Sequence, residues 1–139
     1  MGAWDSGPFD NDTAADWCGD LNDADVSKRP NLVREALTRA AGEVGYLDAD
    51  VACEAIAAAA ILAAQRPAGQ PITSPYAPDF LRGGGRWDVP DDLTALAVRA
   101  IDRIVAADSE WRELWEDADT EGASEAFDAV RELRKVLAA

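Results

Sequence analysis

Between Val51 and Ala64 the sequence is apolar at every position except Glu54. A helix that carries apolar side chains on all sides has no face to turn toward water, so such a helix lies inside a protein. The segment is much shorter than the ~20 apolar residues that a membrane-spanning helix requires. Its many alanines would let neighbouring helices approach closely. We therefore predict a central helix from Val51 to about Arg66, where Pro67 ends it.

The rest of the chain shows the three- and four-residue spacing of apolar positions that is typical of amphipathic helices. The caps and breakers expected at the helix ends are Asp10 or Asn11, Pro30, Gly45, Pro90, Asp108 or Ser109, and Asp117 to Gly122. The expected buried faces are Ala14, Trp17, Cys18 and Leu21; Val33, Leu37, Ala40, Ala41 and Val44; Leu93, Leu96, Ala97, Ala100, Ile101, Ile104 and Val105; Trp111, Leu114, Trp115 and Ala118; and Phe127, Val130, Leu133 and Leu137. No stretch alternates apolar and polar residues as a strand does. We therefore predict one all-α domain over residues 1–139, a compact helical bundle of about five main helices around the Ala-rich central helix.

Residues 67–89 interrupt this pattern with four prolines and three consecutive glycines. No long helix is compatible with that composition, so we predict one long Pro/Gly loop. Within it, Arg82 and Arg86 flank the glycines, and glycine backbone N–H groups beside arginines can hold an anion. The alternative is a flexible hinge, and the Lys-Ser/Thr that completes a phosphate-binding P-loop does not follow.

Charge and the absence of histidine exclude several functions. The chain has 27 acidic and 13 basic residues and a net charge of −14, so it repels nucleic acid and favours cations or basic protein surfaces as partners. The alternative is that the charge serves solubility alone. Without histidine there is no Ser-His-Asp triad and no zinc site built on histidine. Cys18 and Cys53 cannot form a four-thiolate site, and we expect them to be free and buried, a disulfide being the alternative.

No signal-peptide pattern opens the sequence and no segment is long enough for a membrane span, so we expect a cytoplasmic protein that does not bind membranes.

The first candidate site is a row of aspartates on the first predicted helix. Asp12, Asp16 and Asp20 recur every four residues and share one helix face, with Asp10 just before them. Mg²⁺ and Ca²⁺ bind clustered carboxylate oxygens, and Asp48, Asp50 or Glu54 could join the group in the fold. The alternative is a row that faces solvent or meets arginines from elsewhere, because like charges four residues apart repel each other.

Glu54 is a candidate of its own, as the one carboxylate in the apolar central helix. It could be a catalytic acid with a raised pKa. We favour the alternative, in which Glu54 lies in the first turn of its helix, favoured by the helix dipole and paired with an arginine.

A third pattern resembles a calcium-binding loop. Such loops carry carboxylates at positions 1, 3 and 5, glycine at 6 and glutamate at 12. Here Asp117, Asp119, Glu121, Gly122 and Asp128 occupy those positions. Glutamate at position 5 and aspartate at position 12 depart from the rule, so an acidic turn between two helices explains the segment as well.

Three stretches carry a family resemblance: Met1 to Trp4, Gly7 to Asp12 with Ala15 to Trp17, and Asp108 to Glu116. The first two resemble the opening, and the third the closing segment, of the small bacterial family called domain of unknown function 4259. The Ala-rich helix with Glu54 is similar to that family's middle. The resemblance implies a small, bacterial, intracellular domain and brings no activity, cofactor or catalytic residue.

Two function classes follow. We favour a non-enzymatic protein-interaction or regulatory module that binds a basic protein surface through its acidic face, because no catalytic motif is complete. The alternative is a divalent-cation-dependent enzyme of the hydrolase type that uses the carboxylates of the first helix. We expect no cofactor in the favoured class, whereas Mg²⁺ or Ca²⁺ is possible in the alternative.

Overall fold

A computed structural model describes residues 9, 11–66, 90–118 and 121–138 of the chain. Its α-helices are α1 (Asp12–Asp23), α2 (Arg29–Ala41), α3 (Ala49–Ala64), α4 (Asp91–Ile104), α5 (Glu110–Ala118) and α6 (Glu121–Ala138), with a 3₁₀ turn, η1 (Val26–Lys28), between α1 and α2. Helix α5 has nine residues, and the other five α-helices have 12 or more. These residues contain no β-strand, and an isolated β-bridge joins Leu47 and Ser109. The predicted all-α bundle is therefore confirmed.

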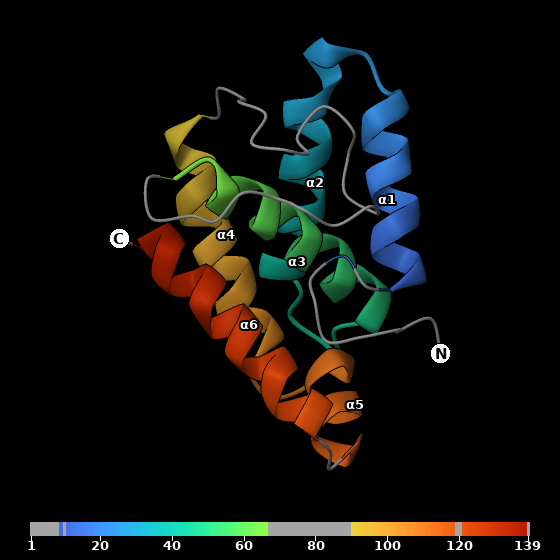
Figure 1. Ribbon diagram of the computed structural model, residues 1–139, viewed down its shortest axis with the longest axis vertical. Helices are drawn as coiled ribbons and strands as arrows, with labels where there is room; N and C mark the ends of the chain where they lie inside the picture. Colours follow the sequence, from blue (N-terminus) through green and yellow to red (C-terminus); the bar gives the residue numbers. More distant parts are fainter. Residues whose placement is uncertain (1–8, 10, 67–89, 119–120, 139) are drawn as a thin grey trace.

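The apolar helix α3 forms the centre of the bundle, as predicted. It contacts α1, α2, α4, α5 and α6 and crosses the middle of the molecule in Figure 1. Three consecutive residues, Ala57, Ala58 and Ala59, are fully buried, so every side of the helix is covered. Although α3 is apolar, no helix in the described ranges is long and apolar enough to cross a membrane.

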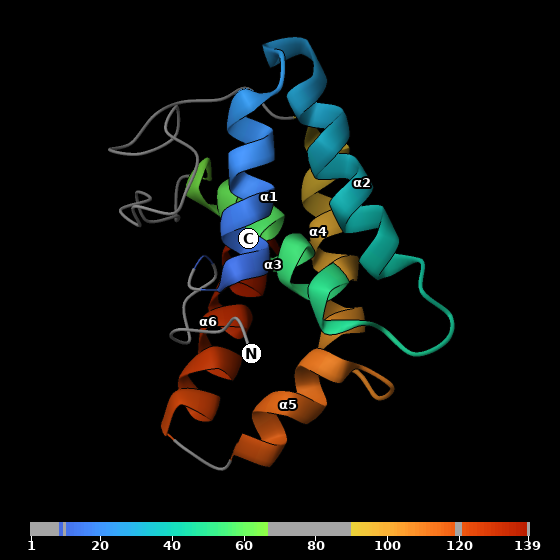
Figure 2. The same cartoon turned by 90° about the vertical axis from the view of Figure 1, so that its right-hand side faces the viewer.

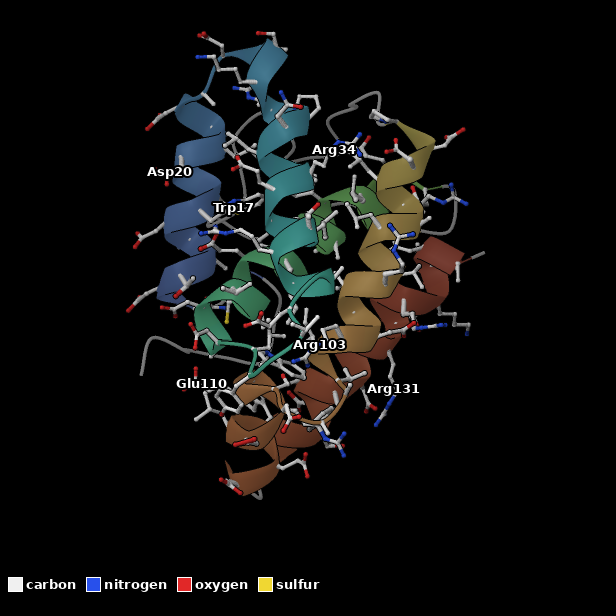
Figure 3. The ribbon with its side chains drawn as sticks, turned by 180° about the vertical axis from the view of Figure 1, so that it is seen from behind. Trp17, Asp20, Arg34, Arg103, Glu110 and Arg131 are labelled. Atoms are coloured by element: carbon white, nitrogen blue, oxygen red, sulfur yellow. The ribbon has the colours of Figure 1, made fainter. Side chains whose placement is uncertain are left out.

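Helix α1 follows its sequence pattern closely. The side chain of Asn11 accepts a hydrogen bond from the backbone N–H of Ala14 at 2.8 Å, which fixes Asn11 as the N-cap. The predicted stripe of Ala14, Trp17, Cys18 and Leu21 is buried against the core. Figure 3 shows Trp17 pointing into the bundle.

Helix α2 ends earlier than predicted. It stops at Ala41 with Gly42 as its C-cap, rather than at Gly45. The prediction that Val44 lies on its buried face is therefore wrong, since Val44 is fully exposed. After Gly42 the chain turns toward the end of α4, where it makes the hydrogen bonds described below.

The C-terminal helices α5 and α6 cover the lower end of the bundle in Figure 2. Trp111 is buried and meets the ring of Phe127 edge-on, with ring centroids 5.3 Å apart, and it also contacts Trp115. Leu114, predicted to be buried, is partly exposed. The predicted Pro/Gly loop at 67–89 lies outside the described residues.

Candidate functional site

The three aspartates of α1 lie on its exposed face. Asp12, Asp16 and Asp20 are all solvent-exposed, and Figure 3 shows Asp20 at the outer edge of the helix. Within the described part of the chain, no three or more His, Cys, Asp or Glu side chains lie close enough together to hold a metal ion. The fourth residue of this candidate group, Asp10, lies outside that part.

One of these aspartates, Asp20, lines an open groove where α1, η1 and α2 meet. The groove has a volume of about 660 Å³. Its lining residues are Asp20, Asp23, Ala24, Asp25, Lys28, Asn31, Leu32 and Glu35. Four of these eight residues are acidic and one is basic, so the groove is strongly negative, with Leu32 and Ala24 as its apolar part.

The corner that holds this groove is fixed by Arg29 at the start of α2. Its Nε donates to the Leu21 carbonyl oxygen at 3.0 Å, and its Nη2 donates to the Asn22 carbonyl oxygen at 2.9 Å. These carbonyls belong to the last turn of α1, where the helix dipole favours a cation. The guanidinium therefore ties the two helices together at the end joined by η1, the upper end in Figure 2.

Glu54 lies within α3, and its side chain pairs with an arginine of α2. Because α3 begins at Ala49, its first-turn carboxylate is Asp50, and the prediction that Glu54 lies in the first turn is wrong. The predicted arginine partner is present, since Oε1 of Glu54 is 3.5 Å from Nη1 of Arg39 on α2. Burial raises the pKa of Glu54, Arg39 opposes that shift, and Asp50 and Asp20 add to it. A half-buried, paired carboxylate with a raised pKa is the result.

Both cysteines are free thiols, as expected. Burial raises the pKa of Cys18 to about 12. Burial, with the nearby carboxylates Asp50, Glu54 and Glu110, raises that of Cys53 to about 12. A thiol with such a pKa carries almost no thiolate at neutral pH, so neither cysteine has the lowered pKa that is typical of a catalytic thiol.

The calcium-loop pattern falls mostly within a helix. Helix α5 ends at Ala118 and α6 begins at Glu121, so positions 5 to 12 of the pattern are helical. Asp117 is exposed at the end of α5, and Asp128 on α6 accepts from Nη1 of Arg131 at 2.5 Å. The segment therefore does not form one twelve-residue loop. Asp119 lies outside the described residues.

Arg82 and Arg86, the candidates for anion binding, also lie outside the described residues.

Sequence reasoning missed a junction centred on Arg103, in the last turn of α4. Its guanidinium donates to four backbone carbonyl oxygens, which belong to Glu43, Gly45, Ala107 and Asp108, at 2.5 to 3.1 Å. The α2–α3 connection is thereby fixed to the α4–α5 turn. A basic residue in a last helical turn is a known signal for bonds to nearby carbonyls, but the two carbonyls some sixty positions away leave no trace in the sequence.

Further bonds reinforce this junction. The N–H of Leu47 donates to the Asp108 carbonyl at 2.8 Å, and the N–H of Glu110 donates to the Leu47 carbonyl at 2.9 Å. Oε1 of Glu110 accepts from the N–H of Ala49 at 2.7 Å, which satisfies a free donor at the start of α3. Figure 3 shows both Arg103 and Glu110 near the α2–α3 connection.

The family model described as "Domain of unknown function (DUF4259)" matches residues 2–132 of the chain. No curated protein and no solved structure matches the chain.

Proposed function

Because this chain belongs to the family described as a domain of unknown function (DUF4259), we infer its role from its own surface. We propose that it is a non-enzymatic protein-interaction module. In this proposal the acidic groove between α1 and α2 binds a basic segment of a partner protein.

The observation that carries the proposal is the chemistry of the groove. Asp20, Asp23, Asp25 and Glu35 surround it, and Lys28 is the single basic residue among the described residues that line it. A concave site lined by one sign of charge concentrates ligands of the opposite sign. The partly buried Leu32 gives an apolar contact for the stem of a lysine or arginine side chain. A basic peptide segment satisfies both requirements.

The charge of the whole chain supports the same class of ligand. A net charge of −14 repels phosphate groups, which disfavours nucleotides and nucleic acids as ligands. It also accelerates the approach of a basic protein and makes that association sensitive to salt.

The alternative, a divalent-cation-dependent hydrolase, has less support. It needs the carboxylates of α1 to converge with others on one point, whereas Asp12 and Asp16 face solvent. The half-buried Glu54 has a raised pKa, as a general acid requires, but it pairs with Arg39 and is not among the residues that line the acidic groove.

Titration of the ¹⁵N-labelled protein with a short oligolysine peptide tests the proposal. We expect the backbone amide shifts to concentrate between Asp20 and Glu35, and the binding to weaken steeply as salt is added. Reversing both Asp20 and Asp23 to lysine should remove most of the affinity. The matched control is Glu132→Lys on α6, an exposed carboxylate outside the groove. Shifts spread evenly over all acidic surfaces, or equal losses in the groove variant and the control, would show that the groove has no special role.

A further inference from the structure

Four large hydrophobic residues are exposed in the described part of the chain, and two of them lie in one short turn. Val44 is 101% exposed and Tyr46 is 48% exposed, and both belong to the connection between α2 and α3. A third, Leu114, follows directly after Glu113, whose carboxylate accepts a hydrogen bond from the Tyr46 hydroxyl at 3.0 Å. Val44 and Tyr46 therefore place two exposed apolar side chains within three residues of one connection, which the hydrogen bond to Glu113 joins to α5.

The turn that carries them is fixed rather than loose. Arg103 binds the carbonyl oxygens of Glu43 and Gly45, on either side of Val44. The bridge between Leu47 and Ser109 holds the residue that follows Tyr46. Figure 2 shows the connection standing out from the side of the bundle, near the α4–α5 turn. An exposed apolar side chain on such a support loses little conformational entropy when it binds, which favours affinity.

We propose that the turn Val44–Tyr46 is a docking surface for a partner protein. Val44 and the Tyr46 ring bind in an apolar pocket of that partner, and lysine or arginine side chains of the partner surround the pocket. This surface is distinct from the acidic groove, which lies at the other end of α2.

Carboxylates around the turn are the reason to expect lysine or arginine side chains on the partner. Burial and the hydrogen bond to Glu113 raise the pKa of the Tyr46 hydroxyl, and the negative charges of Glu113, Glu110 and Asp48 add to that shift, so these carboxylates lie near the turn. The neighbouring cation, Arg103, has its guanidinium N–H groups directed at backbone carbonyls. A partner that covers the two apolar side chains therefore meets carboxylates around them, and basic groups complement these.

The same charges argue against a second copy of this chain as the occupant. A symmetric contact through the turn would bring the two sets of carboxylates together, in a chain whose net charge is already −14.

Selection of peptides from a displayed random library on the immobilised full chain tests the proposal. We expect recovered peptides to combine large apolar residues with lysine or arginine. The best of them, made synthetically, should bind Val44→Asn and Tyr46→Ala about tenfold more weakly than the wild type, as expected for contacts at the centre of an interface. The matched control is Val26→Asn, because Val26 is also strongly exposed and lies in η1, beside the acidic groove.

The remaining outcomes separate this surface from the groove and from self-association. Peptides whose binding is lost in the Asp20 and Asp23 double reversal but kept in Val44→Asn would overturn the docking surface while supporting the groove. Equal losses in the Val44 and Val26 variants, or no enriched peptide, would also overturn it. Sedimentation is run in parallel, and a concentration-dependent dimer that Val44→Asn abolishes would assign the turn to a second copy instead.

Discussion

Nε of Arg103 donates to the carbonyl oxygen of Glu43 at 2.8 Å, so the end of α4 holds the chain shortly after the end of α2. The other nitrogens of the same guanidinium bind three further carbonyls, two of them in the α4–α5 turn. The Arg103 side chain thus joins the α2–α3 connection to the α4–α5 turn.

Removing that guanidinium should destabilise the domain. We expect Arg103→Met to lower the free energy of unfolding by about 2 kcal/mol, the range for hydrogen bonds to a charged donor. Arg103→Lys should recover only part of the loss, because an ammonium group cannot span four carbonyls. Urea unfolding measures both values. The control is Arg99→Met, an exposed arginine on the same helix, and similar losses at positions 99 and 103 would contradict this role for the junction.

The turn beside the junction contains a backbone conformation that favours glycine. Asp108 has a φ of 60°, a region in which a side chain costs about 1–2 kcal/mol. We expect Asp108→Gly to be about 1 kcal/mol more stable than Asp108→Ala, since the backbone bonds of residue 108 are kept in both variants. The adjacent Ala107→Gly is the control and should lower stability, because position 107 has no positive φ. Thermal unfolding of the three variants gives the comparison.

Local sequence patterns encode part of this fold, and long-range contacts determine the rest. The stripe of α1 and the burial of α3 were predictable, since residues 3.6 positions apart share a helix face whatever surrounds the helix. The end of α2 was not, because Gly42 and Gly45 are both suitable stops and bonds from the distant Arg103 hold the chain that follows Gly42. The groove was not predictable either. Asp20 was a candidate residue, but whether Asp20 and Glu35 line the same groove depends on how α1 and α2 are joined.

Glu54 should make stability depend on pH in a defined direction. Its pKa is raised above the usual 4.5 in the folded state, so between the unfolded and folded values the folded state binds more protons. The stabilisation from the protonated form is complete below the unfolded pKa and is lost as pH rises through the folded pKa. Relative to Glu54→Gln, the wild type should therefore lose stability as pH increases from 4.5 upward. Urea unfolding across this range measures the difference, and a difference that grows in favour of the wild type would reverse the sign.

Substitution of Asp16 separates the proposed interaction module from the metal-dependent alternative. Asp16 lies four residues from both Asp12 and Asp20, and like charges at this spacing repel each other by about 0.2–0.5 kcal/mol per pair. If the three aspartates form only a solvated acidic face, Asp16→Asn should leave the free energy of unfolding unchanged or raise it by an amount of that order.

A bound cation would give a different result. Mg²⁺ or Ca²⁺ that binds only the folded state stabilises it by mass action, so the melting temperature rises as the ion concentration exceeds the Kd of the site. Asp16→Asn would then abolish the gain, whereas the control Glu132→Gln, an exposed carboxylate on α6, would keep it. Because Asp12 and Asp16 face solvent and the described residues contain no carboxylate cluster fit for a metal, we expect neither ion to change the melting temperature of the wild type beyond the effect of ionic strength. A stabilisation by sub-millimolar metal that depends on Asp16 would favour the enzyme alternative instead.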